Sequence, residues 1–278
     1  MKAEVNGVEL FFDVDGAKVR AGAEETRTVP TVVLVHTGPG LDHVPYKDHI
    51  GAALVDVAQV VYLDLRGCGR SDRSDPEHWN LDTWAEDLRA LMDEIAVERP
   101  IVLGHGWGCY AAIHYAQRWP DHPERLVLAN PSARVVPPRI VARFDELGGA
   151  EAGEAAYEYF QNPSDGSVAE FLRRCFSLLV PAGMSEVMLT PLWNLELAVH
   201  WAGGESRTVD LRPGLADIRA PTLVVCGTDD AFTPAASVRE VVDGLPRVAG
   251  FREYPGARHT LFRESRQAVA DVLEFVAA

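Results

Sequence analysis

Short runs of aliphatic and β-branched residues recur along the chain and predict the strands of a sheet. The stretch VELFFDVDG at residues 8–16 alternates apolar and polar positions, as a half-buried strand does. The run TVPTVVLVH at 28–36 is rich in β-branched residues and stops at a Gly-Pro-Gly turn, which is typical of a buried strand. Further buried runs lie at 59–65, 100–105, 125–131, 221–227 and 250–256.

Helical patterns separate several of these strands. They cover 81–97, 107–119, 235–245 and 266–278. Alternation of this kind predicts an α/β fold with a mostly parallel, doubly wound sheet and helices on both faces. Active sites of such sheets lie at the carboxyl ends of the strands.

Residues 135–212 interrupt the alternation. They hold short helical patterns such as EAAYEYF and VAEFLRRCFSLL, separated by proline and glycine. We interpret this region as an inserted helical lid between two parts of one α/β core, residues 1–134 and 213–278. The chain has no repeat of fixed period, so a solenoid is not expected.

The loops that follow the predicted strands carry the candidate chemistry. HTGPG at 36–40 turns sharply and can direct a backbone N–H into a site. GHGWG at 104–108 reads G-x-G-x-G, with Gly106 where the strained strand-to-helix turn G-x-S-x-G exposes a serine. Two late loops add an acid, Asp229 or Asp230, and then His259. The chain order is therefore nucleophile position, acid, histidine.

This order of motifs resembles the α/β-hydrolase superfamily, and within it the proline iminopeptidase-like branch. HTGPG is similar to that branch's H-G-G-P-G, LDLRGCGRSD is similar to its D-Q-R-G-x-G-R-S, and a tryptophan follows the nucleophile position. Thr37 and Leu65 depart from the pattern, since they stand where the branch has glycine and glutamine. The resemblance covers nearly the whole chain. It implies the α/β-hydrolase fold and, as the parent reaction, cleavage of an amide or ester by Ser-His-Asp acyl transfer.

Carried onto this chain, the resemblance implies roles for a small set of positions. His259 is the expected general base, because the pKa of an imidazole lies near neutrality. Asp230, the preferred acid, orients that ring and stabilises the imidazolium. The backbone N–H groups of Gly38 and Trp107 are expected to form an oxyanion hole. The catalytic nucleophile would be residue 106, and Gly106 has no side chain with which to attack.

Three hypotheses account for this glycine. In the first, the chain is a serine hydrolase inactivated by replacement of its serine with Gly106. In the second, it is a natural enzyme in which His259 and Asp230 act without a covalent step, by water activation, elimination or cofactor-free oxygenation. In the third, it is a ligand-binding protein that has lost turnover. The retained acid and histidine argue against the third hypothesis, while the sequence leaves the first two open.

The predicted lid suggests how substrate is recognised. By resemblance to iminopeptidases, whose lids hold acidic groups for a free amine, Glu196 is a candidate amine anchor; a solvated glutamate on a helix face is the equal alternative. Apolar and aromatic residues favour an apolar acyl portion. The candidate substrate-binding residues are Thr37, Trp193, Asn194, Glu196 and Phe232.

Composition narrows the possible partners. The net charge of −15 disfavours nucleic acid and anionic membranes, and no apolar stretch is long enough for a membrane helix. The four cysteines are scattered without metal or disulfide spacing, which fits the cytoplasm. We therefore expect a small-molecule acyl or aminoacyl substrate, no metal and no cofactor, with the oligomeric state left open.

Overall fold

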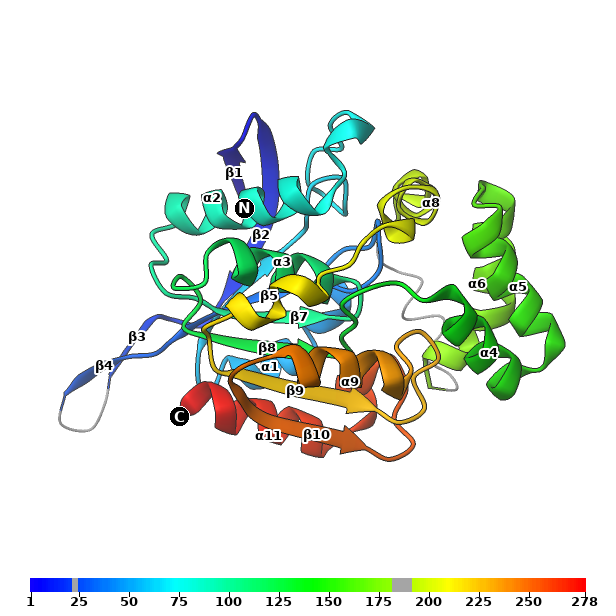
Figure 1. Cartoon of the computed structure of the whole chain (residues 1–278). Coiled ribbons are helices and arrows are strands. Elements are labelled where there is room, and N and C mark those ends of the chain that lie inside the picture. Colours follow the sequence, from blue (N-terminus) through cyan, green and yellow to red (C-terminus); the bar gives the residue numbers. More distant parts are fainter. Residues whose placement is uncertain (22–24, 182–191) are drawn as a thin grey trace.

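A computed structural model describes residues 1–21, 25–181 and 192–278 of the chain. Its centre is an eight-stranded sheet in the order β1-β2-β6-β5-β7-β8-β9-β10 (Figure 1). The first two strands pair antiparallel with each other, β2 pairs antiparallel with β6, and the six remaining strands run parallel. The strands are β1 Lys2–Val5, β2 Val8–Asp15, β5 Thr31–Val35, β6 Gln59–Leu63, β7 Ile101–His105, β8 Arg125–Ala129, β9 Thr222–Gly227 and β10 Val248–Tyr254. The predicted mostly parallel sheet is confirmed.

Both faces of the sheet are buried under helices. In β5, Val33 and Val35 belong to one apolar cluster and Val32 and Leu34 to another, because successive side chains of a strand point to opposite faces. One face is covered by α2 Leu81–Glu94, α3 Gly108–Arg118 and α9 Ala235–Gly244. The other is covered by α1 Ile50–Leu54, α10 Leu261–Glu264 and α11 Arg266–Ala277.

Between β8 and β9 the chain forms further helices with an apolar core of their own. They are α4 Pro137–Gly148, α5 Ala150–Gln161, α6 Asp165–Leu179 and α8 Leu195–Gly203. Phe144, Tyr159 and Phe171 pack in edge-on and tilted contacts at the centre of this group. In Figure 1 the arrowheads of β9 and β10 point to the side of the molecule on which α4, α5 and α6 lie. The inserted helices therefore flank the carboxyl ends of these strands.

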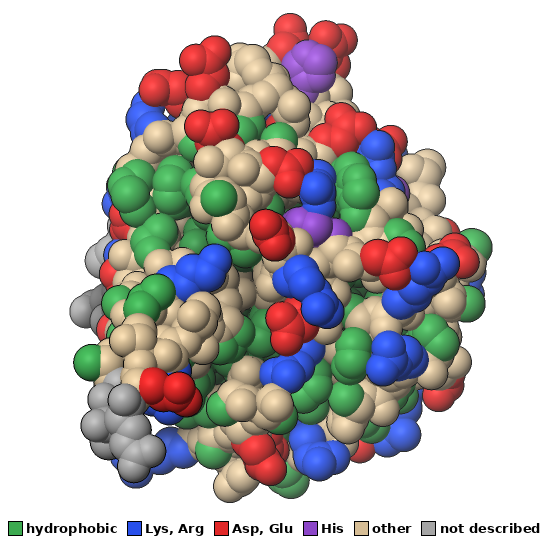
Figure 2. Space-filling model, turned by 90° about the vertical axis from the view of Figure 1, so that its left-hand side faces the viewer, with side chains coloured by type: hydrophobic (Ala, Val, Ile, Leu, Met, Phe, Trp, Pro, Cys, Tyr) green, Lys and Arg blue, Asp and Glu red, His purple; other side chains and the backbone are tan. Residues whose placement is uncertain are grey.

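Some elements were not anticipated from the sequence. They include the strand β1, the short helices α1 and α10, and the separate two-stranded pairing of β3 Val19–Ala21 with β4 Thr26–Thr28. They also include the 3₁₀ turns η1 Val44–Tyr46, η2 Pro76–His78, η3 Glu205–Arg207 and η4 Arg212–Asp217. Figure 2 views the molecule from the side on which β3 and β4 project, and acidic and basic side chains lie interspersed with apolar ones over this face.

Candidate active site

The turn between β7 and α3 has the tight geometry that its glycines predict. Gly106 lies in the left-handed region with a φ of +53°, and its N–H donates to the carbonyl of Ala129 at 2.9 Å. A side chain in that backbone conformation is strained, and glycine relieves the strain. Trp107 follows as the residue that caps the N-terminus of α3.

Asp230 and His259 meet beyond the ends of β9 and β10. Asp230 Oδ2 lies 2.7 Å from His259 Nδ1, and the carboxylate also accepts from the backbone N–H groups of Phe232 and Thr233 and from the Thr233 hydroxyl. Burial alone would raise the pKa of Asp230, but the charge of His259 and these hydrogen bonds outweigh it and lower the pKa. The neighbouring Asp229 is half exposed and faces Arg143 instead. Asp230 is thus an ionised, fully buried partner for the histidine.

His259 lines a cavity of about 110 Å³. The lining is almost entirely apolar, and α5 and α6 supply much of it. The lining residues are Thr37, Gly38, Pro39, Leu41, Tyr159, Val168, Phe171, Leu172, Phe176, Leu179, Val180, Trp193, Ala198, Phe232, His259 and Thr260. Among these described residues, the imidazole of His259 and the phenol of Tyr159 are the ionisable side chains. A histidine paired with a buried carboxylate therefore lines an apolar chamber.

The Thr37 hydroxyl meets the other ring nitrogen of His259. Its Oγ1 lies 3.0 Å from His259 Nε2. A Cβ built at Gly106 would contact Thr37 Oγ1 and would lie 2.6 Å from His259 Nε2, so the three residues converge on one point. Thr37 was predicted to bind substrate, and its contact with His259 was not predicted.

Tyr46 and His105, which were not predicted as site residues, link Thr37 to His259 through hydrogen bonds. The Thr37 N–H donates to the Tyr46 hydroxyl at 2.9 Å, and that hydroxyl lies 2.7 Å from His105 Nδ1. His105 Nε2 lies 2.7 Å from the carbonyl of His259. Burial, together with the nearby charge of His259, lowers the pKa of His105 to about 3, so this ring is neutral. A chain of hydrogen bonds therefore joins the backbone of Thr37 to the backbone of His259.

The two expected oxyanion donors flank the same point. Gly38 follows Thr37 with a φ of +74°, and Trp107 follows Gly106. Within the described ranges, neither backbone N–H donates to another group of the chain. Both N–H groups are therefore available to a ligand.

Comparison with known proteins decides the family. Residues 30–182 match the family model described as alpha/beta hydrolase fold. The chain belongs to the α/β-hydrolase fold family. This membership confirms the predicted fold class and supports the prediction of a hydrolase.

Individual relatives differ in what their names say. The chain is 27% identical to a proline iminopeptidase of Levilactobacillus brevis, over 83% of this chain and 82% of the relative. It is 28% identical to a monoacylglycerol lipase of Mycolicibacterium smegmatis, over 95% and 91%. The solved enol-lactonase from Burkholderia xenovorans LB400 superposes with a TM-score of 0.70 at 25% identity, over all of both chains. The relatives thus include a lipase and a lactonase beside an iminopeptidase.

The predicted substrate-binding residues separate into two groups. Thr37, Trp193 and Phe232 line the cavity. Asn194 is buried but donates from its amide to the carbonyl of Gly67 at 2.9 Å, so it ties α8 to another loop. Glu196 is exposed on α8 and is not part of the cavity lining. The structure therefore does not bring Asn194 or Glu196 to the cavity.

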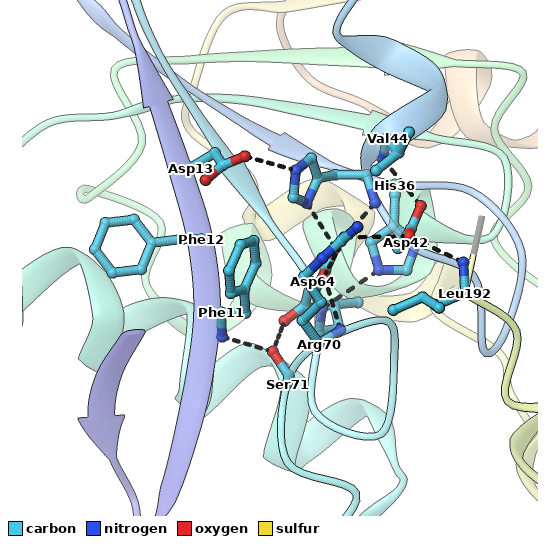
Figure 3. Close-up of polar contacts among 12 residues, drawn as sticks. Phe11, Phe12, Asp13, His36, Asp42, Val44, Asp64, Arg70, Ser71 and Leu192 are labelled. Carbon is cyan, nitrogen blue, oxygen red and sulfur yellow. Dashed lines mark hydrogen bonds and ion pairs between the residues drawn. The ribbon is translucent and has the colours of Figure 1, made fainter. Parts of the chain in front are cut away.

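A second histidine–aspartate pair braces the loop that carries Thr37. His43 Nδ1 lies 2.6 Å from Asp64 Oδ1 and its Nε2 lies 3.3 Å from Asp13 Oδ2. Asp64 also accepts from the backbone N–H groups of His43 and Arg70, and Figure 3 shows Asp64 among these contacts. Burial would raise the pKa of Asp64, but the hydrogen bond and charge of His43 outweigh it and lower the pKa.

Over the described ranges, no cluster of three or more histidine, cysteine, aspartate or glutamate side chains is arranged to hold a metal ion. No described helix combines the length and the apolar character that crossing a membrane requires.

Proposed function

We propose that the chain hydrolyses esters of small, uncharged, apolar acyl groups, with His259 as the proton-transfer base and Asp230 as its partner. The observation that carries this proposal is His259, which lines the apolar cavity while its Nδ1 is held 2.7 Å from Asp230. A base that is oriented by a buried carboxylate can take a proton from an attacking hydroxyl and return it to the leaving alcohol.

The free N–H groups of Gly38 and Trp107 are proposed to receive the negative charge that develops on the carbonyl oxygen. Donors fixed before the reaction stabilise that charge by about 3 kcal/mol each where such a contribution has been measured. Residues 135–212 are proposed to act as the lid, because α5 and α6 supply the apolar wall opposite His259.

Ester cleavage is favoured over aminopeptidase activity by the charges around the cavity. A free amine is bound by acidic side chains, and the described lining has none. Glu196, the one candidate for that role, is exposed on α8. The volume of about 110 Å³ suits a short acyl chain or a single ring. A cytoplasmic location remains a prediction from the scattered cysteines.

The glycine at 106 is proposed to belong to a working site. The hypothesis of an inactivated serine hydrolase requires room for a serine side chain at this position. A Cβ there would contact Thr37 Oγ1 and lie 2.6 Å from His259 Nε2, well inside normal van der Waals distance. These are outer atoms of side chains, so a serine would require Thr37 and His259 to give up their present contact, and that contact favours an enzyme that acts without the serine.

A panel of p-nitrophenyl esters from acetate to palmitate, together with a prolyl anilide, tests this function. The chain, His259→Ala and Gly106→Ser are assayed side by side, with His78→Ala as the control for an exposed histidine. We expect the chain to cleave the short-chain esters and to leave the anilide intact, His78→Ala to match it, and His259→Ala to lose the activity. Hydrolysis by Gly106→Ser alone would instead support the inactivated serine hydrolase, and activity that survives loss of His259 would contradict the mechanism.

A further inference from the structure

We propose that Thr37 is the nucleophile of this site, so that a Thr-His-Asp triad takes the place of the serine triad. The inference rests on the proposed ester hydrolysis and names the hydroxyl on which His259 acts. Thr37 lies on the loop after β5, whereas the serine of a G-x-S-x-G turn lies after β7, at the position of Gly106.

The distances are those of a catalytic triad. Thr37 Oγ1 lies 3.0 Å from His259 Nε2, and His259 Nδ1 lies 2.7 Å from Asp230 Oδ2. A nucleophile and its base are recognised by hydrogen-bond reach of about 2.6–3.2 Å, with the base in turn oriented by a third group. Thr37 and His259 both line the apolar cavity, so the hydroxyl is presented to the same space as the proposed acyl group.

A second threonine of the lining shows that this contact is specific. Thr260 also borders the cavity, but its hydroxyl donates to Glu264 at 2.8 Å and lies 3.3 Å from the carbonyl of Leu179. The Thr260 hydroxyl is therefore hydrogen-bonded away from His259. Thr37 is the threonine of the described lining whose hydroxyl meets the histidine.

The backbone of Thr37 is held on both sides. Its N–H donates to the Tyr46 hydroxyl, and its carbonyl lies 3.0 Å from His36 Nδ1. Tyr46 in turn contacts His105, which contacts the carbonyl of His259. Because these groups are buried and paired, the hydroxyl and the imidazole are fixed relative to each other before substrate binds.

Gly106 makes the arrangement possible. The Cβ of any other residue at 106 would meet Thr37 Oγ1. A serine at 106 and the threonine hydroxyl therefore compete for one position beside His259 Nε2. The sequence changes both members of this pair relative to the family pattern, with glycine at 106 and threonine at 37.

The chemistry balances with these groups and water alone. Thr37 Oγ1 attacks the acyl carbon and its proton passes to His259 Nε2; the ester C–O bond breaks and the leaving alcohol takes that proton. Water then attacks the threonyl ester, giving one proton to His259, which returns it to Thr37 Oγ1 as the acid is released. Asp230 stays ionised beside the imidazolium in both halves.

Covalent labelling with a fluorophosphonate tests the inference. Attack by a hydroxyl forms a P–O bond with loss of fluoride, and trypsin releases residues 28–47 as one peptide in which fragmentation locates the label. The chain, Thr37→Val, Thr37→Ser, Thr28→Val and Gly106→Ser are labelled and assayed on the best ester. Valine keeps the shape of threonine, and circular dichroism confirms that each variant is folded.

The inference predicts a label on Thr37 in the chain and in Thr28→Val, whose threonine is exposed and lies outside the cavity lining, and on the introduced serine in Thr37→Ser. Thr37→Val is expected to lose the label and at least about a thousandfold in turnover, since loss of a triad nucleophile leaves little beyond binding and the oxyanion hole. Turnover that survives in Thr37→Val but still requires His259 would overturn the inference and leave the proposed function standing. Label and turnover found only in Gly106→Ser, with the label on the introduced serine, would overturn both.

Discussion

His43 and His259 each set Nδ1 against a buried aspartate, at 2.6 Å from Asp64 and 2.7 Å from Asp230. The two pairs differ at the other nitrogen. His43 Nε2 lies 3.3 Å from a second carboxylate, that of Asp13, whereas His259 Nε2 meets a hydroxyl at the wall of a cavity. The His43 side chain is 1% exposed and that of His259 is 11% exposed.

The comparison shows that a histidine–aspartate pair is not in itself a catalytic device. A ring with a carboxylate at each nitrogen acts as a cross-link, and here it fixes the loop after β5. A ring with one nitrogen facing a cavity can exchange protons with a substrate or a hydroxyl. The function of each pair therefore depends on what its second nitrogen meets, and the following substitutions test that distinction.

The largest effect is expected for Asp230→Asn. Asparagine can hold the imidazole in the wrong tautomer and does not stabilise its positive charge, so turnover of the best ester should fall about 10⁴-fold, as in a serine protease. Steady-state kinetics at equal concentrations of folded protein measure the fall, because Asp230 also accepts from two backbone N–H groups and its replacement should lower the unfolding temperature as well. Asp229→Asn is the matched control, since this neighbour is half exposed, and its turnover should equal that of the chain. Equal losses in both variants would contradict the assignment of Asp230.

Asp64→Asn is expected to lose stability while it keeps turnover per folded molecule. Its carboxylate faces His43 and accepts from two backbone N–H groups, so its loss leaves buried donors uncompensated and should lower the free energy of unfolding by about 3–5 kcal/mol. Urea unfolding measures this, while turnover per folded molecule should change by less than about tenfold. A stable variant without turnover would show that this pair also takes part in the chemistry.

The same carboxylate should contribute to acid sensitivity. The pKa of Asp64 is lowered in the folded state, so its stabilisation is complete above its unfolded pKa, about 3.9, and is lost as the pH falls through the lower folded value. Urea unfolding from pH 6 downward should give a constant difference between the chain and Asp64→Asn above about pH 5, and a shrinking difference below about pH 4. A difference that grows on acidification would contradict the sign of the shift.

Tyr46→Phe should lower turnover moderately, through its effect on Thr37 and His259. The substitution removes the acceptor of the Thr37 N–H and the partner of His105, and leaving such buried groups unpaired costs about 1–3 kcal/mol. We expect kcat to fall about tenfold or more with KM nearly unchanged, because the tyrosine positions Thr37 and does not line the main cavity. An effect confined to KM would contradict a positioning role.

Glu196→Gln is expected to have the smallest effect. The side chain is exposed and outside the cavity lining, so ester turnover should stay within about twofold of the unchanged chain. Kinetics with an ester and with an aminoacyl ester of similar size measure any preference for a free amine. A loss restricted to the aminoacyl ester would restore the amine-anchor role that the iminopeptidase resemblance implies.

Much of the core fold could be predicted because strand and helix patterns are local. The apolar runs that become β5, β6, β7, β8 and β9 are ended by recognisable turns, and the glycines of GHGWG mark the strand-to-helix turn. The strand β1 was missed because KAEV, at Lys2–Val5, carries no strong apolar run. The strand is instead formed by its antiparallel hydrogen bonding to β2, which lies next to it in the sheet.

The candidate site was predicted only in part for a related reason. Asp230 and His259 stand in loops after strands, where a motif order identifies them. The contact of Thr37 with His259 joins residues 222 positions apart, and it depends on the absence of a side chain at a third position, Gly106. Asn194 and Glu196 lie outside the cavity lining, which the sequence could not indicate because the direction of a side chain at or on α8 depends on packing against distant loops, as the contact of Asn194 with Gly67 shows.

The most direct test of the central claim compares His259→Ala with His43→Gln. The value of kcat/KM for a short-chain p-nitrophenyl ester is measured at equal concentrations of folded protein. We expect kcat/KM to fall at least about a thousandfold in His259→Ala and less than about tenfold in His43→Gln. His43→Gln should instead unfold at a lower urea concentration. Retained hydrolysis in His259→Ala, or equal losses in the two variants, would contradict the claim that the open nitrogen of His259 carries the reaction.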